Sequence, residues 1–120
     1  MTRESSASNL IRAWEDGRIR VGEQWLTEHC IVTAETIVRD WAVTDSRRVT
    51  IDDLAPALSL DPELIIIGAG NTARSPDVDL MAELAERSIG VEFMQTSAAC
   101  RTYNVLVHEG RRVAAALIVD

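Results

Sequence analysis

Hydrophobic and polar positions follow two different patterns along the chain, and the pattern changes near residue 49. Between Asn9 and Asp45, β-branched and aromatic residues predominate in "NLIRAW", "RIRVG" and "CIVTAETIVRDW", which favours strands. Asp16 and Gly17 separate the first two segments, and Asp-Gly is preferred in two-residue type I′ hairpins because both central residues need a positive φ. We therefore predict a hairpin and an N-terminal antiparallel β layer.

The segment "VTIDDLAPAL" begins the second pattern and predicts a short helix. Thr50 is suited to the N-cap and Asp53 to the third helical position, which together form a capping box. Pro56 and Ser59 keep this helix short. The next segment, "ELIIIGA", is apolar without alternation, as is typical of a strand that is buried on both faces.

The C-terminal half predicts a helix, a strand, a second helix and a last strand. "SPDVDLMAELAER" has Ser75 as a candidate N-cap and Pro76 at the first helical position. After the strand "IGVEFM", "TSAACRTYNVLVHEG" reads as a helix capped at Thr96 or Ser97 and ended by Gly110. "RRVAAALIV" completes the pattern. Strand, helix and strand with short connections predict a right-handed parallel βαβ unit.

These elements predict the α/β class, with a parallel βαβ unit inside a central sheet. A chain of 120 residues fits one domain and can bury a core without a disulfide or a metal ion. We expect residues 1–8 to form a disordered tail and residues 9–120 to form a single α/β domain.

Charge and composition exclude several classes of function. The formal charge of −7 argues against a nucleic-acid partner and against an anionic membrane. The twelve basic residues are all arginine, so Schiff-base chemistry and a Walker-type phosphate loop are excluded. Two cysteines do not make a disulfide framework, and the start "MTRESSASN" has no apolar signal segment. We expect a cytoplasmic protein without a stable membrane insertion, a metal ion or a cofactor.

The sequence Gly68, Gly70 and Ala73 spells GxGxxA after a predicted strand, which is a weak signal for a dinucleotide loop. Glu92 even lies where a ribose-binding acid would be expected. However, a helix that began near Gly70 would carry Pro76 in its interior, at a cost of about 3 kcal/mol. We therefore predict that the helix starts at Pro76 and that the loop does not bind a dinucleotide.

A crevice is the stronger prediction for this region. If the strands at 64–67 and 91–94 are parallel neighbours, the loops at 68–75 and 94–97 border one crevice, and two helix amino termini face it. The candidate ligand-binding residues, for an anionic group, are Gly68, Gly70, Asn71, Arg74, Thr96, Ser97, Cys100 and Arg101. The alternative, which we favour, is that the polar residues only cap helices and that Arg101 pairs with a carboxylate inside the domain. Cys100, in the first turn of its helix, is more simply a small buried residue than a reactive thiol.

The segment "EFMQTSAACRTYNVLVHEGRRVAAAL" closely resembles the signature of a small single-domain family. That family includes the mitochondrial assembly factor 3 of respiratory complex I and an adipogenesis-associated cytosolic protein of animals, and this chain looks like a bacterial-type member. "GRIRVG" and "TIDDL" agree more loosely, so the likeness covers most of the chain after residue 8. The positions that match are Glu92, Thr96, Ala99, Cys100, Arg101, Thr102, Asn104 and Glu109.

The resemblance implies a three-layer α/β domain around a mixed sheet whose closing strand is antiparallel to its neighbours. It also implies a role in assembly or scaffolding, and it supplies no catalytic residues. We therefore expect a protein-binding or assembly module rather than an enzyme. The alternative is a protein that binds, or acts on, a small anionic ligand in the crevice between residues 68–75 and 95–101.

Overall fold

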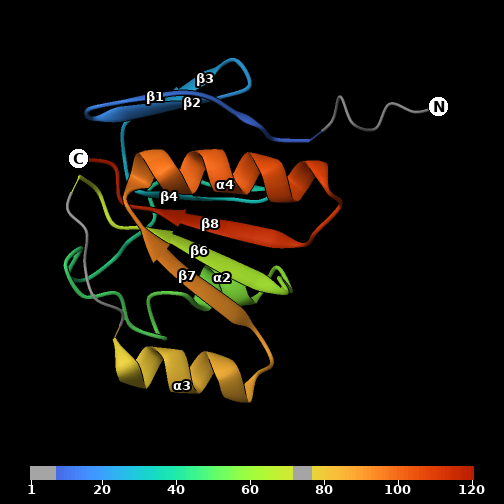
Figure 1. Ribbon diagram of the computed structural model, residues 1–120. Helices are drawn as coiled ribbons and strands as arrows, with labels where there is room; N and C mark the ends of the chain where they lie inside the picture. Colours follow the sequence, from blue (N-terminus) through green and yellow to red (C-terminus); the bar gives the residue numbers. More distant parts are fainter. Residues whose placement is uncertain (1–7, 72–76) are drawn as a thin grey trace.

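Two β-sheets and three helices make up the part of the chain that is described by this computed structural model, residues 8–71 and 77–120 (Figure 1). A three-stranded sheet and one long helix lie on one face of a five-stranded sheet, and two shorter helices lie on the other face. In chain order the elements are β1 (Ile11–Glu15), β2 (Arg18–Val21), β3 (Gln24–Leu26), β4 (Cys30–Val32), β5 (Ile37–Val38), α2 (Ala55–Leu58), β6 (Leu64–Gly68), α3 (Val78–Glu86), β7 (Gly90–Met94), α4 (Thr96–His108) and β8 (Val113–Leu117). The predicted α/β class, with three layers and a mixed central sheet, is confirmed.

The small sheet has the order β1-β2-β3 and is antiparallel throughout, as predicted for the N-terminal layer. Glu15 pairs with Arg18 across the two-residue turn, so the hairpin is confirmed. Its predicted turn type is wrong, because Gly17 has φ +85° while Asp16 keeps a negative φ. The left-handed conformation falls only on the glycine, which adopts it without steric cost. The strand β3 was not predicted, since three residues give too short a pattern.

The large sheet has the order β5-β4-β8-β6-β7. β6 lies parallel to β7, as predicted, and parallel to β8 on its other side. The closing strand β8 is antiparallel to β4 but parallel to β6, so the implied antiparallel relation to both neighbours is wrong. The reason is the connection: α4 carries the chain from the end of β7 back over the sheet, and such a crossover returns a strand in the parallel direction.

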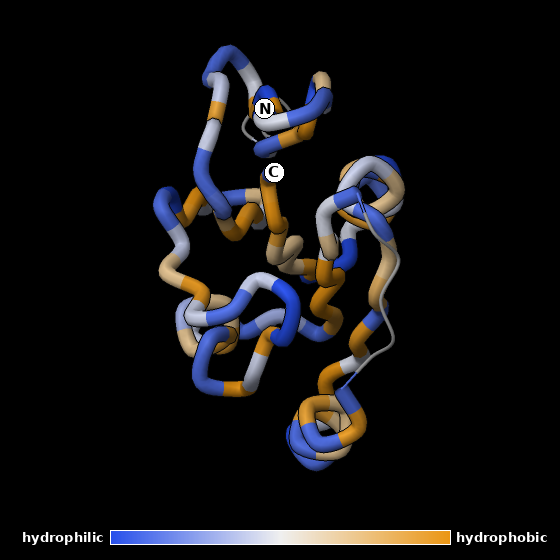
Figure 2. Tube along the Cα trace, turned by 90° about the vertical axis from the view of Figure 1, so that its left-hand side faces the viewer, coloured by the Kyte–Doolittle hydropathy of each residue, from blue (hydrophilic) through white to orange (hydrophobic). Residues whose placement is uncertain are grey.

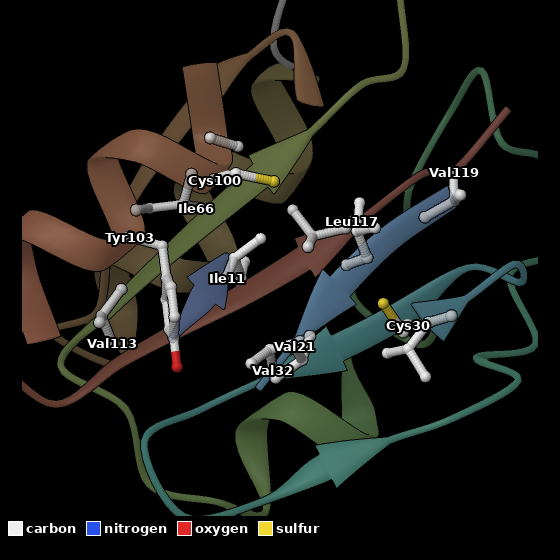
Figure 3. Close-up of a cluster of buried hydrophobic side chains, with 14 of the residues drawn as sticks. Ile11, Val21, Cys30, Val32, Ile66, Cys100, Tyr103, Val113, Leu117 and Val119 are labelled. Carbon is white, nitrogen blue, oxygen red and sulfur yellow. The ribbon is translucent and has the colours of Figure 1, made fainter. Parts of the chain in front are cut away.

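Alternating side chains of β6 divide the core into two clusters. Leu64 and Ile66 face α4 and the small sheet, whereas Ile65 and Ile67 face α2 and α3. Figure 3 shows the first cluster, in which side chains from both sheets and from α4 meet. Hydrophobic residues accordingly gather along the central strands, and the peripheral loops are largely hydrophilic (Figure 2). The uninterrupted apolar run that predicted a strand buried on both faces is thereby explained.

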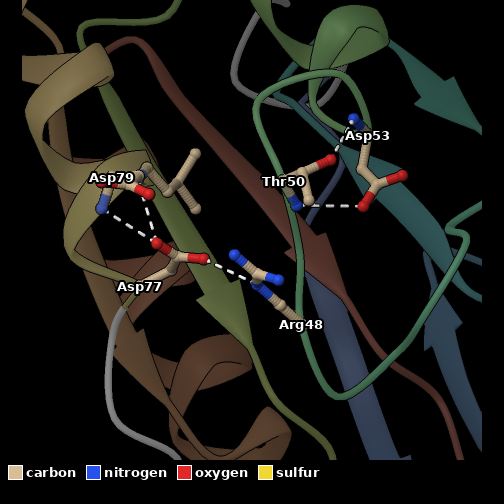
Figure 4. Close-up of polar contacts among 6 residues, drawn as sticks. Arg48, Thr50, Asp53, Asp77 and Asp79 are labelled. Carbon is tan, nitrogen blue, oxygen red and sulfur yellow. Dashed lines mark hydrogen bonds and ion pairs between the residues drawn. The ribbon is translucent and has the colours of Figure 1, made fainter.

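Two carboxylates bond to backbone amides in the segments that lead into α2 and α3 (Figure 4). Thr50 and Asp53 make the reciprocal bonds expected of a capping box: the Thr50 amide donates to the Asp53 carboxylate at 2.9 Å, and the Asp53 amide donates to Thr50 Oγ1 at 3.3 Å. They close the turn before α2, which begins at Ala55 with Leu54 as its N-cap, so the expected N-cap at Thr50 is wrong. For α3 the N-cap is Asp77, whose carboxylate accepts from the amides of Asp79 and Leu80, so the expected N-cap at Ser75 is wrong. A carboxylate both accepts these bonds and interacts favourably with the positive end of the helix.

No helix within residues 8–71 and 77–120 is long and apolar enough to cross a membrane. The predicted tail up to residue 7 and the loop residues 72–76, which include Arg74 and Pro76, lie outside the described residues.

Candidate functional site

The carboxyl ends of β6, β7 and β8 meet at one edge of the large sheet. Gly68 stands between Met94 on one side and Leu117 on the other, which confirms the predicted parallel pairing of the strands at 64–67 and 91–94. A Cβ atom at Gly68 would lie 3.1 Å from the Ala99 Cβ and 2.9 Å from a methyl group of Leu117. Gly68 therefore allows α4 to approach the sheet closely and does not line the crevice.

A crevice of about 240 Å³ lies at this edge and contains four of the predicted residues: Gly70, Asn71, Thr96 and Ser97. The β1-β2 hairpin and the end of the chain complete its wall, with Trp14, Glu15, Asp16, Ile19, Ile118, Val119 and Asp120. Sequence reasoning missed this second wall, because the placement of β8 between β4 and β6 brings distant segments together. The sequence did predict the Asp-Gly turn, and Asp16 of that turn lines the crevice, but nothing in the sequence indicated that the turn would lie there.

Thr96 joins the loops around the crevice. Its hydroxyl donates to the carbonyl of Ile118 at 2.7 Å and accepts from the amide of Gly70 at 2.8 Å, while its own amide donates to the Gly70 carbonyl at 2.9 Å. The N-cap of α4 is Gln95, without a side-chain bond to the helix, so the expected cap at Thr96 or Ser97 is wrong. The hydroxyl instead satisfies backbone groups of two other segments.

Two hydrogen bonds hold the end of the chain. The amide of Gly17 donates to the carbonyl of Asp120 at 3.1 Å, and the amide of Val119 donates to Nδ1 of His29 at 3.0 Å. Gly70 has φ +77°, and a Cβ atom there would lie 2.7 Å from the Asp120 carboxylate. Glycine is therefore favoured at this position by its conformation, while the exposed Asp120 side chain can turn away from an added Cβ atom.

The crevice is lined by negative charges, whereas the sequence predicted a site for an anion. Three carboxylates, those of Glu15, Asp16 and Asp120, line it, and the described lining residues include no arginine. Arg101 lies on the surface with its guanidinium carbon 5.9 Å from the centre of the Trp14 ring. An anion in this crevice would meet one helix amino terminus but also three like charges, which disfavours it.

The amino terminus of α3 does not contribute to the crevice lining. Its first amides are already bonded to Asp77, and the guanidinium of Arg48, 3.0 Å away, holds the pKa of that carboxyl below its usual value. Since α3 begins at Val78, eight residues beyond Gly70, the geometry of a dinucleotide loop is absent from the described part of this region.

Both thiols are buried in the core between α4 and the sheets (Figure 3). Burial raises the pKa of Cys100 to about 12, and it does the same for Cys30. A thiol with such a pKa is protonated at neutral pH and is a poor nucleophile. Cys100 is thus the small buried residue that we favoured, and it does not line the crevice.

Other motif residues attach the small sheet to α4. The side-chain amide of Asn104 donates to the carbonyl of Ile11 at 2.8 Å and accepts from the Ile11 amide at 2.9 Å. Beside it, the Tyr103 hydroxyl donates to the carbonyl of Asn9 at 2.6 Å. These contacts show that Asn104, with Thr96, Ala99 and Cys100, has a direct role in the fold.

Comparison with curated proteins finds relatives whose descriptions differ. NADH dehydrogenase (ubiquinone) 1 alpha subcomplex assembly factor 3 of Mus musculus is 33% identical over 91 residues, which cover 74% of this chain and 49% of that protein. The chain thus spans about half the length of this relative. The 13 kDa major membrane protein of Francisella tularensis is 29% identical over 102 residues, covering 83% of this chain and 80% of that protein.

Among solved structures, a protein of Bordetella parapertussis has the same fold, with a TM-score of 0.87 and 35% sequence identity. The match covers 95% of this chain and 98% of that one. Residues 11–118 also match the family described as "Protein of unknown function (DUF498/DUF598)". The match extends from the first residue of β1 to just beyond β8, so it includes both sheets and all the described helices. The chain therefore belongs to the DUF498/DUF598 family.

Proposed function

We propose that the chain is a protein-binding or assembly module and not an enzyme. The observation that carries this proposal is the 33% identity, over 74% of the chain, to a protein named as an assembly factor. Because the chain spans only about half of that relative, the proposal concerns the kind of activity, binding during assembly, and does not extend to the relative's own partners.

The state of the chemically reactive groups supports binding rather than catalysis. The Thr96 hydroxyl and His29 Nδ1 are both bonded to backbone groups that hold the crevice together. Burial raises the pKa of Cys100 to about 12. Nucleophilic catalysis needs an accessible group that a neighbouring base or a lowered pKa has activated, and none of these three groups is in that state.

We place this module in the cytoplasm. Cys30 and Cys100 are both free and buried, which is the usual state of cysteines in a reducing compartment.

The proposal is tested by capture and reconstitution. The full chain, carrying an N-terminal tag, is crosslinked in its native cells, and the captured proteins are identified by mass spectrometry. We expect at least one partner to form a complex with the purified chain, with a Kd below about 1 μM, as measured by titration calorimetry. The proposal is wrong if no captured protein binds the purified chain.

The second candidate function is small-ligand binding in the crevice between residues 68–75 and 95–101. One observation favours it: the crevice encloses about 240 Å³ beside the amino terminus of α4, which has no side-chain cap. The three carboxylates rank it below protein binding. A thermal-shift screen of anionic metabolites and nucleotides tests it, on wild type and on Ser97→Val, which changes a residue that lines the crevice. A ligand at one hundred times its Kd stabilises by about 2.7 kcal/mol, and a hit that the folded variant loses would support this function.

A further inference from the structure

The outer face of the three-stranded sheet carries an exposed tryptophan between two arginines. Arg20 on β2 pairs with Trp25 on β3, and the next pair, Ile19 with Leu26, points the opposite way into the core. Side chains alternate between the faces of a sheet, so Arg20 and Trp25 point outward. We call Arg18, Arg20 and Trp25 the Trp25 face.

Among the three tryptophans, Trp25 is the most accessible. Trp41 is buried and donates from its indole nitrogen to the Asp53 carbonyl, and Trp14 is half-buried, whereas Trp25 is 37% exposed. The Arg18 guanidinium carbon lies 3.9 Å from the centre of the Trp25 ring, and that of Arg20 lies 6.0 Å away. Cations at these distances are attracted to the face of the ring and hold it in place.

The two arginines differ in how well they are paired. Arg18 donates to Glu15 at 2.8 Å. Arg20 has no ion pair with any residue in 8–71 or 77–120, and its Nε is shielded from solvent without a hydrogen-bond partner. A buried donor without a partner is uncommon in folded proteins and calls for an explanation. Because Nε is shielded, an external carboxylate reaches it only after the half-buried Arg20 side chain turns outward. The carboxylate would then accept from Nε and a terminal nitrogen together, because the planar guanidinium binds carboxylates in this two-pronged manner.

We propose that the Trp25 face binds an acidic segment of a protein partner, with a carboxylate on Arg20 and an adjacent apolar side chain against Trp25. This inference rests on the proposed function and names the surface that serves it. Charge complementarity supports the occupant: in a chain of net charge −7, this face presents two arginines, of which Glu15 pairs with only one. Tryptophan and arginine are also the residues most enriched where binding energy concentrates.

The same charges argue against other anionic partners. A nucleic acid or an anionic membrane presents a continuous array of phosphates, which a chain of charge −7 repels outside this small face. One free guanidinium beside one indole instead matches a single carboxylate flanked by an apolar residue.

A displayed library of random twelve-residue peptides, selected on the full chain, tests this inference. We expect enrichment of peptides that contain Asp or Glu next to a large apolar residue. The best peptide, labelled with fluorescein, should bind Arg20→Ala and Trp25→Ala at least tenfold more weakly than wild type, as should a peptide with its acid changed to the amide. Arg47→Ala is the matched control, since the Arg47 side chain is 77% exposed and lies outside this face, and it should change the Kd less than twofold.

Arg20→Lys sharpens the test, because lysine keeps the charge but cannot bind a carboxylate in the two-pronged manner; it should bind the labelled peptide several-fold more weakly than wild type. Circular dichroism confirms that each variant is folded. Selection of peptides without acidic residues, or equal binding by wild type and Arg20→Ala, would overturn the inference.

Two further measurements separate other occupants. Binding to vesicles of phosphatidylserine and phosphatidylcholine that Arg20→Ala abolishes would overturn the protein assignment in favour of a membrane. Self-association in ultracentrifugation that Trp25→Ala abolishes would overturn it in favour of a second copy. If captured partners bind Arg20→Ala as tightly as wild type, this inference fails and the proposed function stands; if no partner binds wild type, the proposed function itself fails.

Discussion

The crevice, which has the β1-β2 hairpin as one wall, and the Trp25 face on the outer side of the β1-β2-β3 sheet treat their polar groups in opposite ways. In the crevice, the Thr96 hydroxyl both donates and accepts a hydrogen bond within the fold. On the Trp25 face, Arg20 retains a shielded Nε without a partner in the described part of the chain. The crevice has the larger concavity, but its polar groups already stabilise the fold. The two regions thus differ in whether their polar groups are already used by the fold.

The largest effect that we expect comes from Thr96→Val, which preserves shape and removes the hydroxyl. The amide of Gly70 and the carbonyl of Ile118 would each lose a partner, so the free energy of unfolding should fall by about 3 kcal/mol. Urea denaturation measures this change. Thr102→Val, on the same helix and also half-buried, makes neither bond and should cost less than about 1 kcal/mol. If both variants lost the same free energy of unfolding, the hydrogen bonds of Thr96 in the crevice would contribute no more than an ordinary position on the helix surface.

A second test uses alkaline pH to probe the core beneath both surfaces. The unfolded thiols lose their protons near pH 9, whereas burial raises the pKa of Cys30 and Cys100 to about 12 in the folded protein. Between these values the folded state binds more protons, so its stability is full below pH 9 and decreases above it. The two thiols together should cost about 2 kcal/mol by pH 9.5.

Denaturation in urea at a series of pH values measures this slope. In Cys100→Ala only one thiol remains, so the free energy of unfolding should decrease about half as steeply with rising pH. This holds whatever the substitution does to the stability at pH 7. Burial also raises the pKa of Tyr103, which acts in the same direction at still higher pH. A stability that is constant from pH 8 to pH 10 would contradict the burial of both thiols.

Two glycines allow the crevice contact of Asp120 to be measured separately from backbone strain. Gly17 and Gly70 both have positive φ, but only at Gly70 would a Cβ atom meet another residue, the Asp120 carboxylate at 2.7 Å. Gly17→Ala should destabilise by about 1 kcal/mol through its conformation alone. Gly70→Ala should cost at most about 0.5 kcal/mol more, because the exposed Asp120 side chain can turn away from the added Cβ atom. Thermal denaturation of both variants tests the difference, and an extra cost above about 1 kcal/mol at Gly70 would show that Asp120 is held firmly in the crevice.

The smallest effect is expected on the Trp25 face. Arg20→Met keeps an unbranched stem, removes the unsatisfied Nε and loses a cation–π contact at 6.0 Å. We expect the free energy of unfolding to change by less than about 0.5 kcal/mol, because the lost attraction and the removed desolvation penalty offset each other. A loss above about 1 kcal/mol, measured in urea, would show that Arg20 is part of the fold and weaken the comparison.

Local patterns predicted most of the fold. The apolar run of β6 and the hairpin at Gly17 depend on neighbouring residues, and both are found. The Thr50–Asp53 bond is also found, but it closes a turn, and α2 begins later, after Leu54. The parallel direction of β8 relative to β6 was not predicted, because the order of the strands in the sheet decides which strand β8 pairs with. The three residues of β3 were too few for an alternating pattern, although they carry Trp25.

The candidate site was predicted on one side only. Gly70 and Thr96 follow strands that pair in parallel, so their meeting can be read from the order of elements. Glu15 and Asp120 reach the same crevice through the hairpin and the end of the chain. Their approach reverses the charge expected there, and no local pattern encodes it. Whether Arg74 also approaches remains a prediction, since it lies outside the described residues.

The hydrogen bond from the Val119 amide to His29 fixes the tautomer of one imidazole ring. Since Nδ1 accepts this bond, the ring proton of the neutral side chain resides on Nε2. Nitrogen NMR distinguishes these two positions directly. His29 is thus a built-in reporter of the crevice wall: loss of the accepting Nδ1 signature, with the fold intact, would reveal that the end of the chain has detached.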